Sequence, residues 1–534
     1  MSKGPDPGRP AAIPPAWPGM VACLAASAWI GLGPIHRGHH ADSLIPVLAS
    51  LQRWTPFYWE QDRFGMLVPL LALPIRDPMA NLLAQGCMTV AGGLAAFFLL
   101  ARFVARDASY PMAAALAASA FVLLAPELFR FEYLIDQPYG VGLSLALLGL
   151  ILAEPGRGTL PRAGGLALML LAHWVNCATA VYLAPLVAAR GALGLLADPG
   201  PTLALARRIR ARWERGRLGE LDVGHAIGAG VRWMRGSETA VALVLLAVGY
   251  AAGAAMMGLV TVTSPTNAEA LPPRRWPEAW WRLAGQMAIA QRPGTWPLAF
   301  GGAGMFGLAA WAGSAEVRRR SPGVIRGAAA LLISAVASWL LIGTRSWVAG
   351  NGYDYRYTMV ATIQIQAACW LVAAAPLRAW PGDARLRRWA VFAAPALLVL
   401  ASAARDGRPS PARVRADFDR RYGAMTADLL DAGCTHLAGT YWTVWPVVFH
   451  ANVVLRDRGS TRKFWGATYR ASSSPNPANR DVPREEAVIA IPADERGSPA
   501  WLGRLDYEPV EEIAGRPTIR VFRPIPRPRA GRSD

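Results

Sequence analysis

The sequence predicts an α-helical polytopic membrane protein of about eleven spans, followed by a small α/β domain outside the cytoplasm. Of its 534 residues, 53% are hydrophobic and only 17% are charged, and the mean hydropathy is positive at +0.24. An ordinary soluble chain of this length is less apolar and richer in charge. The apolar residues also form blocks of roughly 20 residues, the length that a helix needs to cross a bilayer. Residues 405–534 lack such blocks.

The apolar blocks place most of the spans directly. One block at 163–190 is interrupted by HWVN, and it is long for one crossing and short for two. We interpret it as two short, tilted spans around His173–Asn176. The other expected spans cover residues 17–35, 79–104, 110–127, 137–153, 239–259, 296–314, 326–344, 358–376 and 389–404.

Basic residues predict the orientation, because Arg and Lys gather in cytoplasmic loops. The richest basic segment lies between 190 and 238, and EVRRRSPGVIR and RAWPGDARLRRW follow it. All three lie inside only if the block at 163–190 crosses twice or re-enters. The expected organisation is therefore a disordered cytoplasmic tail (1–16), a transmembrane domain (17–404) with an outer loop (36–78) and a cytoplasmic basic loop (190–238), and a periplasmic α/β domain (405–534).

The net charge of +19 follows from this orientation. Much of the excess lies in the inside loops, so it does not indicate nucleic-acid binding. Residues 205–217 are expected to form a helix on anionic lipid. Four of the five cysteines lie in expected spans and Cys434 is alone outside, so the sequence predicts no disulfide framework.

Local patterns predict the elements of the C-terminal region. The stretch VRADFDRRYGAMTADLLDAG (414–433) predicts an amphipathic helix that ends at a glycine. The apolar runs AVIAIP (487–492) and TIRVFRPI (518–525) predict strands, separated by turns rich in Pro and Ser. Trp442 and Trp445 are spaced to share one helical face. For these two side chains we favour docking on the bilayer over stacking against a sugar.

The outer loop HRGHHADSLIPVLASLQRWTPFYWEQDRFG (36–65) is rich in histidines, carboxylates, arginines and aromatic residues. Asp42 follows the first span directly. The stretch DSLIPVLASLQRW places three leucines on one face, which predicts a helix lying along the membrane surface. The stretch TPFYWEQDRFG then brings Tyr58, Trp59 and neighbouring acids back toward the membrane. For the aromatic side chains alone we favour an interfacial belt.

Two further outer loops carry matching polar groups. Carboxylates and arginines from three separate loops would therefore meet at one outer surface. The second loop, PELFRFEYLIDQPYG, supplies Glu127, Arg130, Glu132 and Asp136, and the third, TRSWVAGNGYDYRYTM, supplies Arg345, Asp354, Arg356 and Tyr357 immediately before a span.

This layout resembles the GT-C superfamily of membrane glycosyltransferases, which take sugars from polyprenyl-phosphate donors. The resemblance covers most of the chain: an Asp just beyond the first span, a second acidic outer loop, an RY pair opening a late span, and an outer domain beginning near HLAGTYWTVWPVVFHANVVL. The common paired acid is here HADS, a single Asp preceded by His, which leaves the subfamily and metal use open. The resemblance implies a multi-pass bacterial inner-membrane enzyme with a cytoplasmic N-terminus. It would transfer a sugar, with inversion, to an envelope glycan, lipid or protein.

The chemistry of that reaction assigns the candidate roles. The acceptor hydroxyl needs a base, for which Asp42 is the candidate. The leaving phosphate needs a cation, and the fork of an arginine matches phosphate oxygens. Candidates for the phosphate are Arg356, with Arg345 or Arg130 as second choice and Tyr357 beside it, whereas Glu132, Asp136 and His40 are candidates for orienting the acceptor or holding a divalent cation such as Mg²⁺ or Mn²⁺.

Each assignment has an alternative. Asp42 could cap a helix that starts at Ser43, Arg356 could be a snorkelling anchor, and Asp136 could be a solvated turn residue. A polymerase or ligase acting on lipid-linked glycans would use the same arginine chemistry. A flippase or transporter would show paired broken helices in two related halves, and the sequence shows no such symmetry.

Overall fold

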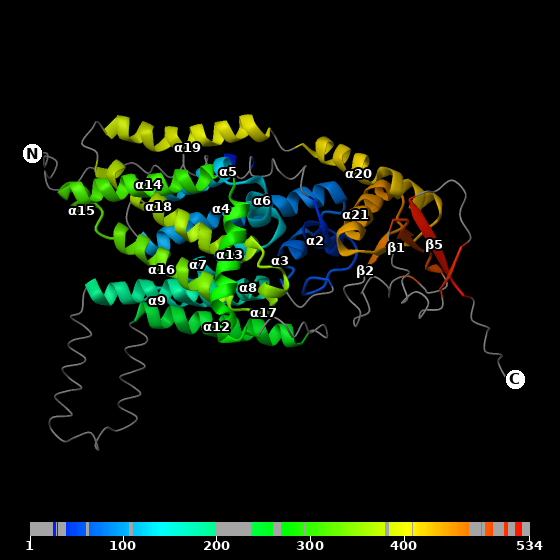
Figure 1. Ribbon diagram of the computed structural model, residues 1–534, viewed down its shortest axis with the longest axis horizontal. Helices are drawn as coiled ribbons and strands as arrows, with labels where there is room; N and C mark the ends of the chain where they lie inside the picture. The colour runs from blue at the N-terminus through cyan, green and yellow to red at the C-terminus, as the bar shows by residue number, and fades with distance from the viewer. Residues whose placement is uncertain are drawn as a thin grey trace, which may run out of the picture.

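The structure is a computed structural model, and it describes residues 25–27, 29, 39–59, 64–105, 110–197, 237–259, 269–292, 294–379, 384–407, 410–468, 482, 486–494, 507–510 and 518–525. The expected tail (1–16), the expected helix at 205–217 and most of the expected span at 17–35 lie outside these residues. The molecule is elongated, with a bundle of long helices in the larger part and a β-sheet at the C-terminal end (Figure 1).

Every expected span from residue 79 onward falls on a helix. An additional helix, α13 (Trp276–Ala290), is not among the expected spans. It packs against α16 (Val324–Gly343) and carries the charged residues Glu278 and Arg282. The long helices are α4 (Pro78–Ala105), α5 (Tyr110–Leu124), α7 (Tyr139–Leu152), α8 (Thr159–Val175), α9 (Thr179–Ala197), α12 (Glu238–Gly258), α14 (Thr295–Gly313), α16 (Val324–Gly343), α18 (Met359–Ala379) and α19 (Ala384–Asp406).

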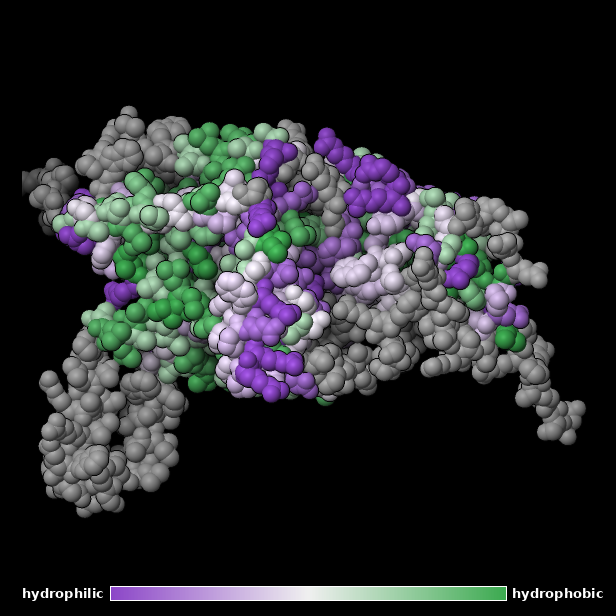
Figure 2. Space-filling model, in the orientation of Figure 1, coloured by the Kyte–Doolittle hydropathy of each residue, from purple (hydrophilic) through white to green (hydrophobic). Residues whose placement is uncertain are grey.

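Several of these helices can cross a membrane. Among the described residues, five helices are long and apolar enough: α4, α9, α12, α16 and the segment Tyr355–Leu377. A sixth results if Glu127–Asp136 and Tyr139–Leu152, bent by 60° at their junction, form one span. Figure 2 shows an apolar surface over the bundle and a hydrophilic band between it and the C-terminal end. The chain is therefore a polytopic membrane protein, and the number of about eleven spans stays a prediction.

The predicted break at HWVN is confirmed. Between α8 and α9, Asn176 has an extended backbone, and its side-chain oxygen accepts a backbone N–H two residues later at 3.0 Å. The outer loop docks on this break, where the Gly65 N–H donates to the Trp174 carbonyl at 2.8 Å. A Cβ at Gly65 would lie 2.5 Å from that oxygen, so only glycine permits this approach.

The C-terminal domain is a mixed sheet with helices packed on it. The predicted helix is α20 (Pro411–Asp431), which ends just before Gly433 with its φ of 69°. The two predicted strands are confirmed as β3 and β5. The strand order is β2-β1-β3-β5-β4, with β1 parallel to β2 and β3 and the other pairs antiparallel. The remaining elements are β1 (His436–Gly439), α21 (Tyr441–Asp457), β2 (Trp465–Thr468), β3 (Ile489–Pro492), β4 (Tyr507–Pro509) and β5 (Ile519–Pro524).

The helix after the first span is confirmed, but it is buried within the protein and does not have the exposed face that a helix lying freely on a membrane surface would have. α2 (Ala41–Leu51) is buried from Ala41 to Ser50, except for the half-buried Pro46. It packs against α3 (Leu67–Ala72), α4 and α21. A helix on a bilayer needs a polar face toward water. α2 is apolar nearly all round, and the C-terminal domain covers the face that would otherwise be exposed.

The orientation of the chain is a testable prediction. Cysteines introduced as Glu214→Cys, in the basic loop, and Arg458→Cys, in the C-terminal domain, should lie on opposite sides of the membrane, since basic loops stay inside. In intact cells an impermeant maleimide should label only position 458, and permeabilisation should expose position 214. Equal labelling of both sites in intact cells would contradict the predicted topology.

The C-terminal domain should lose stability in mild acid. Burial lowers the pKa of His436 to about 4, whereas the unfolded chain titrates near 6.5. Between these values the unfolded state binds more protons, so stability falls as the pH drops from about 6.5 to about 4 and is flat above. The whole change is about 3 kcal/mol. The neighbouring thiol of Cys434, in a variant whose other cysteines are Ser, reports local unfolding by its protection from labelling.

The control for this experiment is His436→Gln, which cannot titrate. Burial also lowers the pKa of His450 in the same domain, so a smaller slope should remain in the variant. If the protection of the Cys434 thiol from labelling does not change with pH in the parent protein, His436 is not buried in its neutral form.

Candidate active site

Asp42 lies at the junction of the bundle and the C-terminal domain, with only 2% of the residue exposed. It is the second residue of α2. Pro46, four residues later, has no N–H to donate to the Asp42 carbonyl, as a helix would otherwise require. The Tyr58 hydroxyl takes over that role and donates to the Asp42 carbonyl at 3.0 Å. The proline in α2 thus explains why a tyrosine from the outer loop is drawn to Asp42.

Donors from four segments surround the Asp42 carboxylate. The hydroxyls of Tyr58, at 3.3 Å, and Tyr441 both reach Oδ1. The Gln137 amide donates to Oδ2 at 3.2 Å, and Nη1 of Arg356 lies 3.8 Å from the same oxygen. Donors and a cation therefore converge on both oxygens of this buried carboxyl group, and a general base at this position must be ionised to take a proton.

The alternative that Asp42 caps a helix is wrong. The helix begins at Ala41 and its N-cap is His40. The Ser43 hydroxyl accepts the His40 N–H at 3.3 Å and donates to the His40 carbonyl at 2.9 Å. Asp42 therefore lies inside the first turn, and its side chain is directed at the tyrosines, the glutamine and the arginine.

A π-helical turn brings the second outer loop to Asp42. After α6 (Glu127–Phe131), η2 (Glu132–Asp136) closes with the Gln137 N–H donating to the Glu132 carbonyl, five residues back, at 3.2 Å. Wide turns of this kind are frequent at functional sites. The turn leaves Asp136 and Gln137 facing Asp42, and both are buried. The alternative of Asp136 as a solvated turn residue is therefore wrong.

Glu132 and Asp136 hold buried oxygens that lack partners. Within the described part of the chain, Oε2 of Glu132 and Oδ1 of Asp136 accept no hydrogen bond. Burial raises the pKa of both carboxyl groups, and that of Glu132 reaches about 9. Nδ1 of His40 lies 3.3 Å from Oδ1 of Asp136, but neither atom is placed for a hydrogen bond. Buried polar atoms are normally satisfied, so such atoms indicate a ligand or water.

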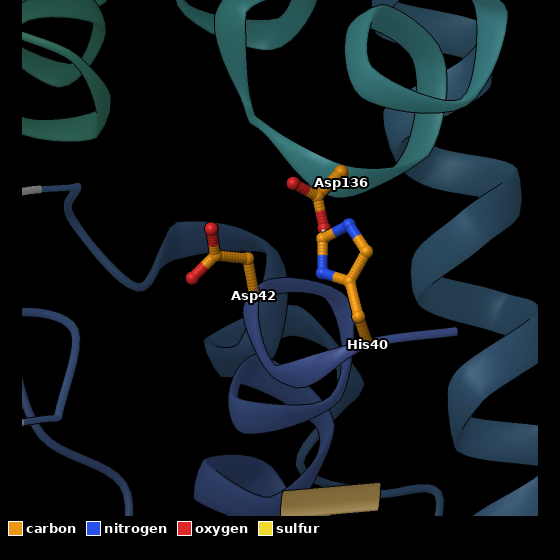
Figure 3. Close-up of side chains that lie close together, drawn as sticks. All are labelled: His40, Asp42 and Asp136. Atoms are coloured by element: carbon orange, nitrogen blue, oxygen red, sulfur yellow. The ribbon is translucent and has the colours of Figure 1, made fainter. Parts of the chain in front are cut away.

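Figure 3 shows His40 and Asp42 projecting from the start of α2 toward Asp136 on η2. Each of the three offers one ligand atom within 4.8 Å of the others. A nitrogen with carboxylate oxygens suits Mn²⁺ better than Mg²⁺. Burial lowers the pKa of His40, against the opposing effect of Asp42, which favours the neutral ring that a metal needs. Arg356 already brings positive charge to Asp42. Of the three residues, His40 and Asp136 are therefore better placed to bind a cation.

Arg356 lies in the turn that opens the late span, η6 (Tyr355–Thr358). The Asp354 carboxylate caps this turn by accepting the Arg356 N–H at 3.0 Å. The guanidinium donates to the Tyr357 hydroxyl at 3.2 Å and lies 5.1 Å from the centre of that ring. Only 13% of the Arg356 side chain is exposed. It is directed at Asp42, whereas the charged head of a snorkelling anchor is exposed to water.

The second-choice arginines have other contacts. Arg130 is buried and donates to the Val122 carbonyl at 3.1 Å, near the end of α5. Arg345 precedes α17 (Ser346–Gly350), and its backbone pairs with Ala270. The structure thus places Arg356, rather than these two, beside Asp42.

Sequence patterns do not single out two of the residues that hold Asp42. Tyr441 comes from the C-terminal domain, 399 residues away, and Gln137 is a neutral residue among acids. Tyr58 is buried at the site, so its assignment to an interfacial belt is wrong. The acids Glu60 and Asp62 lie outside the described residues. The only sequence signal for Tyr441 is its place in a run of aromatics at the start of the outer domain.

A small cavity opens beside these residues. It has a volume of about 50 Å³ and lies between α2, α3, α4 and η2. Its wall is mainly apolar, and its polar lining residues are Ser43, Tyr58, Gln85, Thr89 and Asp136. That wall includes Pro46, Val47, Phe64, Met66, Val68, Pro69, Leu82, Ile135 and Pro138.

Fold and site together define a class: a polytopic α-helical membrane protein whose C-terminal α/β domain closes over a buried carboxylate paired with an arginine. No model of a known protein family matches the sequence, and no curated protein matches it. Among solved structures, the chain is similar to ArnT from Cupriavidus metallidurans bound to undecaprenyl phosphate. The likeness covers 94% of this chain and 97% of that one, at 12% identity and a TM-score of 0.44. We therefore build the function from the residues of the site.

Proposed function

We propose that this protein is a membrane glycosyltransferase of the GT-C type that moves a sugar from a polyprenyl-phosphate carrier to an acceptor at the outer face of the inner membrane. The observation that carries the proposal is the pairing of Asp42 with Arg356 at the end of a late span. A base and a fixed cation, 3.8 Å apart, are what transfer from a lipid phosphate requires.

The reaction is a single displacement with inversion. The acceptor oxygen bonds to the anomeric carbon of the sugar as the bond from that carbon to the phosphate oxygen breaks. Asp42 takes the proton of the acceptor hydroxyl. Arg356 stabilises the charge that develops on the leaving phosphate, and the Tyr357 ring and hydroxyl hold its guanidinium in place.

The position of the site suits a lipid-linked donor. The segment Tyr355–Leu377 is one of the candidate spans, and Arg356 is its second residue. A phosphate at headgroup height would therefore meet Arg356 while its polyprenyl tail stays in the bilayer. A cation bound at His40 and Asp136 would add positive charge beside the sugar.

The deciding experiment incubates the purified protein with radiolabelled polyprenyl-phosphate sugars and isolated cell envelopes. Transfer of label from lipid to envelope material supports the proposal. Loss of sugar transfer after EDTA treatment, and recovery of transfer on addition of Mn²⁺, would assign a role to the His40–Asp136 cation site. If label instead crosses liposome membranes on its original lipid, without transfer, the protein is a flippase.

A further inference from the structure

The C-terminal domain contributes two side chains to the site. Tyr441 and Trp442 open α21, whose first turn faces α2. The Tyr441 hydroxyl donates to Oδ1 of Asp42, whereas Arg356 lies beside Oδ2. The C-terminal domain thus contacts Oδ1 of Asp42, and the arginine proposed to bind the phosphate lies beside Oδ2. A substrate on this side is the acceptor, because the donor phosphate occupies the other.

The contact between the domain and α2 is firm enough to position these residues. The indoles of Trp59 and Trp445 lie 5.7 Å apart, and Trp445 is fully buried. The Gln52 amide donates to the Phe464 carbonyl at 2.7 Å, and the Lys463 ammonium donates to the Gln52 carbonyl at 2.9 Å. The start of α21 is therefore fixed relative to Asp42.

Trp442 differs from Trp445, although one helical turn separates them. Its residue is 52% exposed, and its ring lies edge-on to His40, at 5.4 Å, and to Tyr441, at 5.0 Å. These two contacts fix the orientation of the indole and leave much of its aromatic surface exposed. Both tryptophans lie in α21 with the expected spacing. The expectation that both dock on the bilayer is wrong for Trp445, which fills the core, whereas Trp442 borders the acidic site.

The groups beside Trp442 are of the kind that bind hydroxyls. Oε2 of Glu132 and Oδ1 of Asp136 are buried acceptors without hydrogen bonds in the described part of the chain, and His40 links Asp136 to the indole. Burial raises the pKa of both carboxyl groups, and a protonated carboxyl group can both donate to a hydroxyl and accept from one. An aromatic face, which carries negative charge density, attracts the C–H groups of an apolar ring face. A pyranose offers hydroxyls at its edge and C–H groups on its face.

From this arrangement, and resting on the proposed function, we propose that the acceptor is itself a glycan whose terminal pyranose stacks on Trp442. Its hydroxyls are bound by Asp136 and Glu132, and the reacting hydroxyl lies at Asp42. A serine or threonine acceptor offers a hydroxyl but no ring face to occupy the indole. The outer domain is then the element that selects the acceptor.

The first test identifies the acceptor class. Labelled lipid-linked sugar is supplied with envelopes treated either with proteinase K or with periodate, which destroys vicinal diols of glycans. We expect transfer to survive the protease and to be lost after periodate, with the label in polysaccharide. Label that disappears with the protease would overturn the inference while leaving the proposed function intact. No transfer to any envelope preparation would contradict the proposed function itself.

The second test uses variants of the indole. Trp442→Ala should raise the half-saturating concentration of protease-treated envelope polysaccharide about tenfold, with that of the donor lipid unchanged. Trp442→Phe should recover most of the difference, since it keeps an aromatic face. Trp281→Ala, which removes another exposed indole (81%) on α13, should match the parent. Unchanged acceptor dependence in Trp442→Ala would overturn the inference.

A binding measurement makes the inference independent of activity. Immobilised envelope polysaccharide should capture the detergent-purified parent about tenfold more tightly than Trp442→Ala, even without donor. Equal polysaccharide binding by the parent and by Trp442→Ala would overturn the inference.

Discussion

Asp42→Asn should transfer sugar at least a hundredfold more slowly than the parent, while inserting and binding donor lipid normally. Loss of a general base typically costs about 10²–10⁴-fold in rate. The asparagine keeps the size of Asp42, and its oxygen can still accept from Tyr58 and Tyr441. Its amide nitrogen can neither accept from Gln137, which donates to Oδ2 in the parent, nor take the proton of the acceptor. The measurement is single-turnover transfer of radiolabelled sugar under saturating donor and acceptor.

Asp77→Asn is the matched control for that variant. The Asp77 carboxylate caps the start of α4 by accepting the Ala80 N–H at 2.8 Å, and Asn caps a helix as well as Asp does. This control should transfer sugar at the parental rate. Near-normal transfer by Asp42→Asn would move the role of base to Asp136 or Glu132, the other buried carboxylates at the site.

Arg356→Ala should weaken use of the donor by about 10- to 100-fold in kcat/KM. A hydrogen bond to a charged group contributes about 1.5–3 kcal/mol, and here the partner is a phosphate whose charge grows in the transition state. Arg356→Lys should recover only part of the loss, because an ammonium cannot make the paired contact of the guanidinium fork. Steady-state kinetics with varied lipid donor measure both effects.

Arg345→Ala distinguishes a local cation from general surface charge. Arg345 comes from the same outer loop, but its backbone pairs with Ala270 and the residue precedes α17. We expect donor kinetics close to the parent. Equal losses in the Arg345 and Arg356 variants would indicate that the loop attracts anionic lipid as a whole, with no specific phosphate clamp at Arg356.

Much of the fold could be predicted because its signals are local. A span is a run of apolar residues, and each run from residue 79 onward became a helix. Gly433 marks the end of α20, and short apolar runs mark β3 and β5. The site could be predicted only in part. Asp42, Asp136 and Arg356 stand out as charges at the ends of spans, where charged residues are costly.

The sequence by itself determined that this chain is a polytopic membrane protein with a C-terminal α/β domain and acidic and basic groups in several loops. Which of these groups meet depends on the tertiary structure. Burial of α2 depends on a domain more than 350 residues later in the chain, and so does the contact of Tyr441 with Asp42. No local pattern encodes such contacts, because they form when apolar surfaces from distant segments are removed from water together. Because of this packing, the helix that begins at Ala41 is buried beside the candidate active site, although the sequence predicts it on the membrane surface.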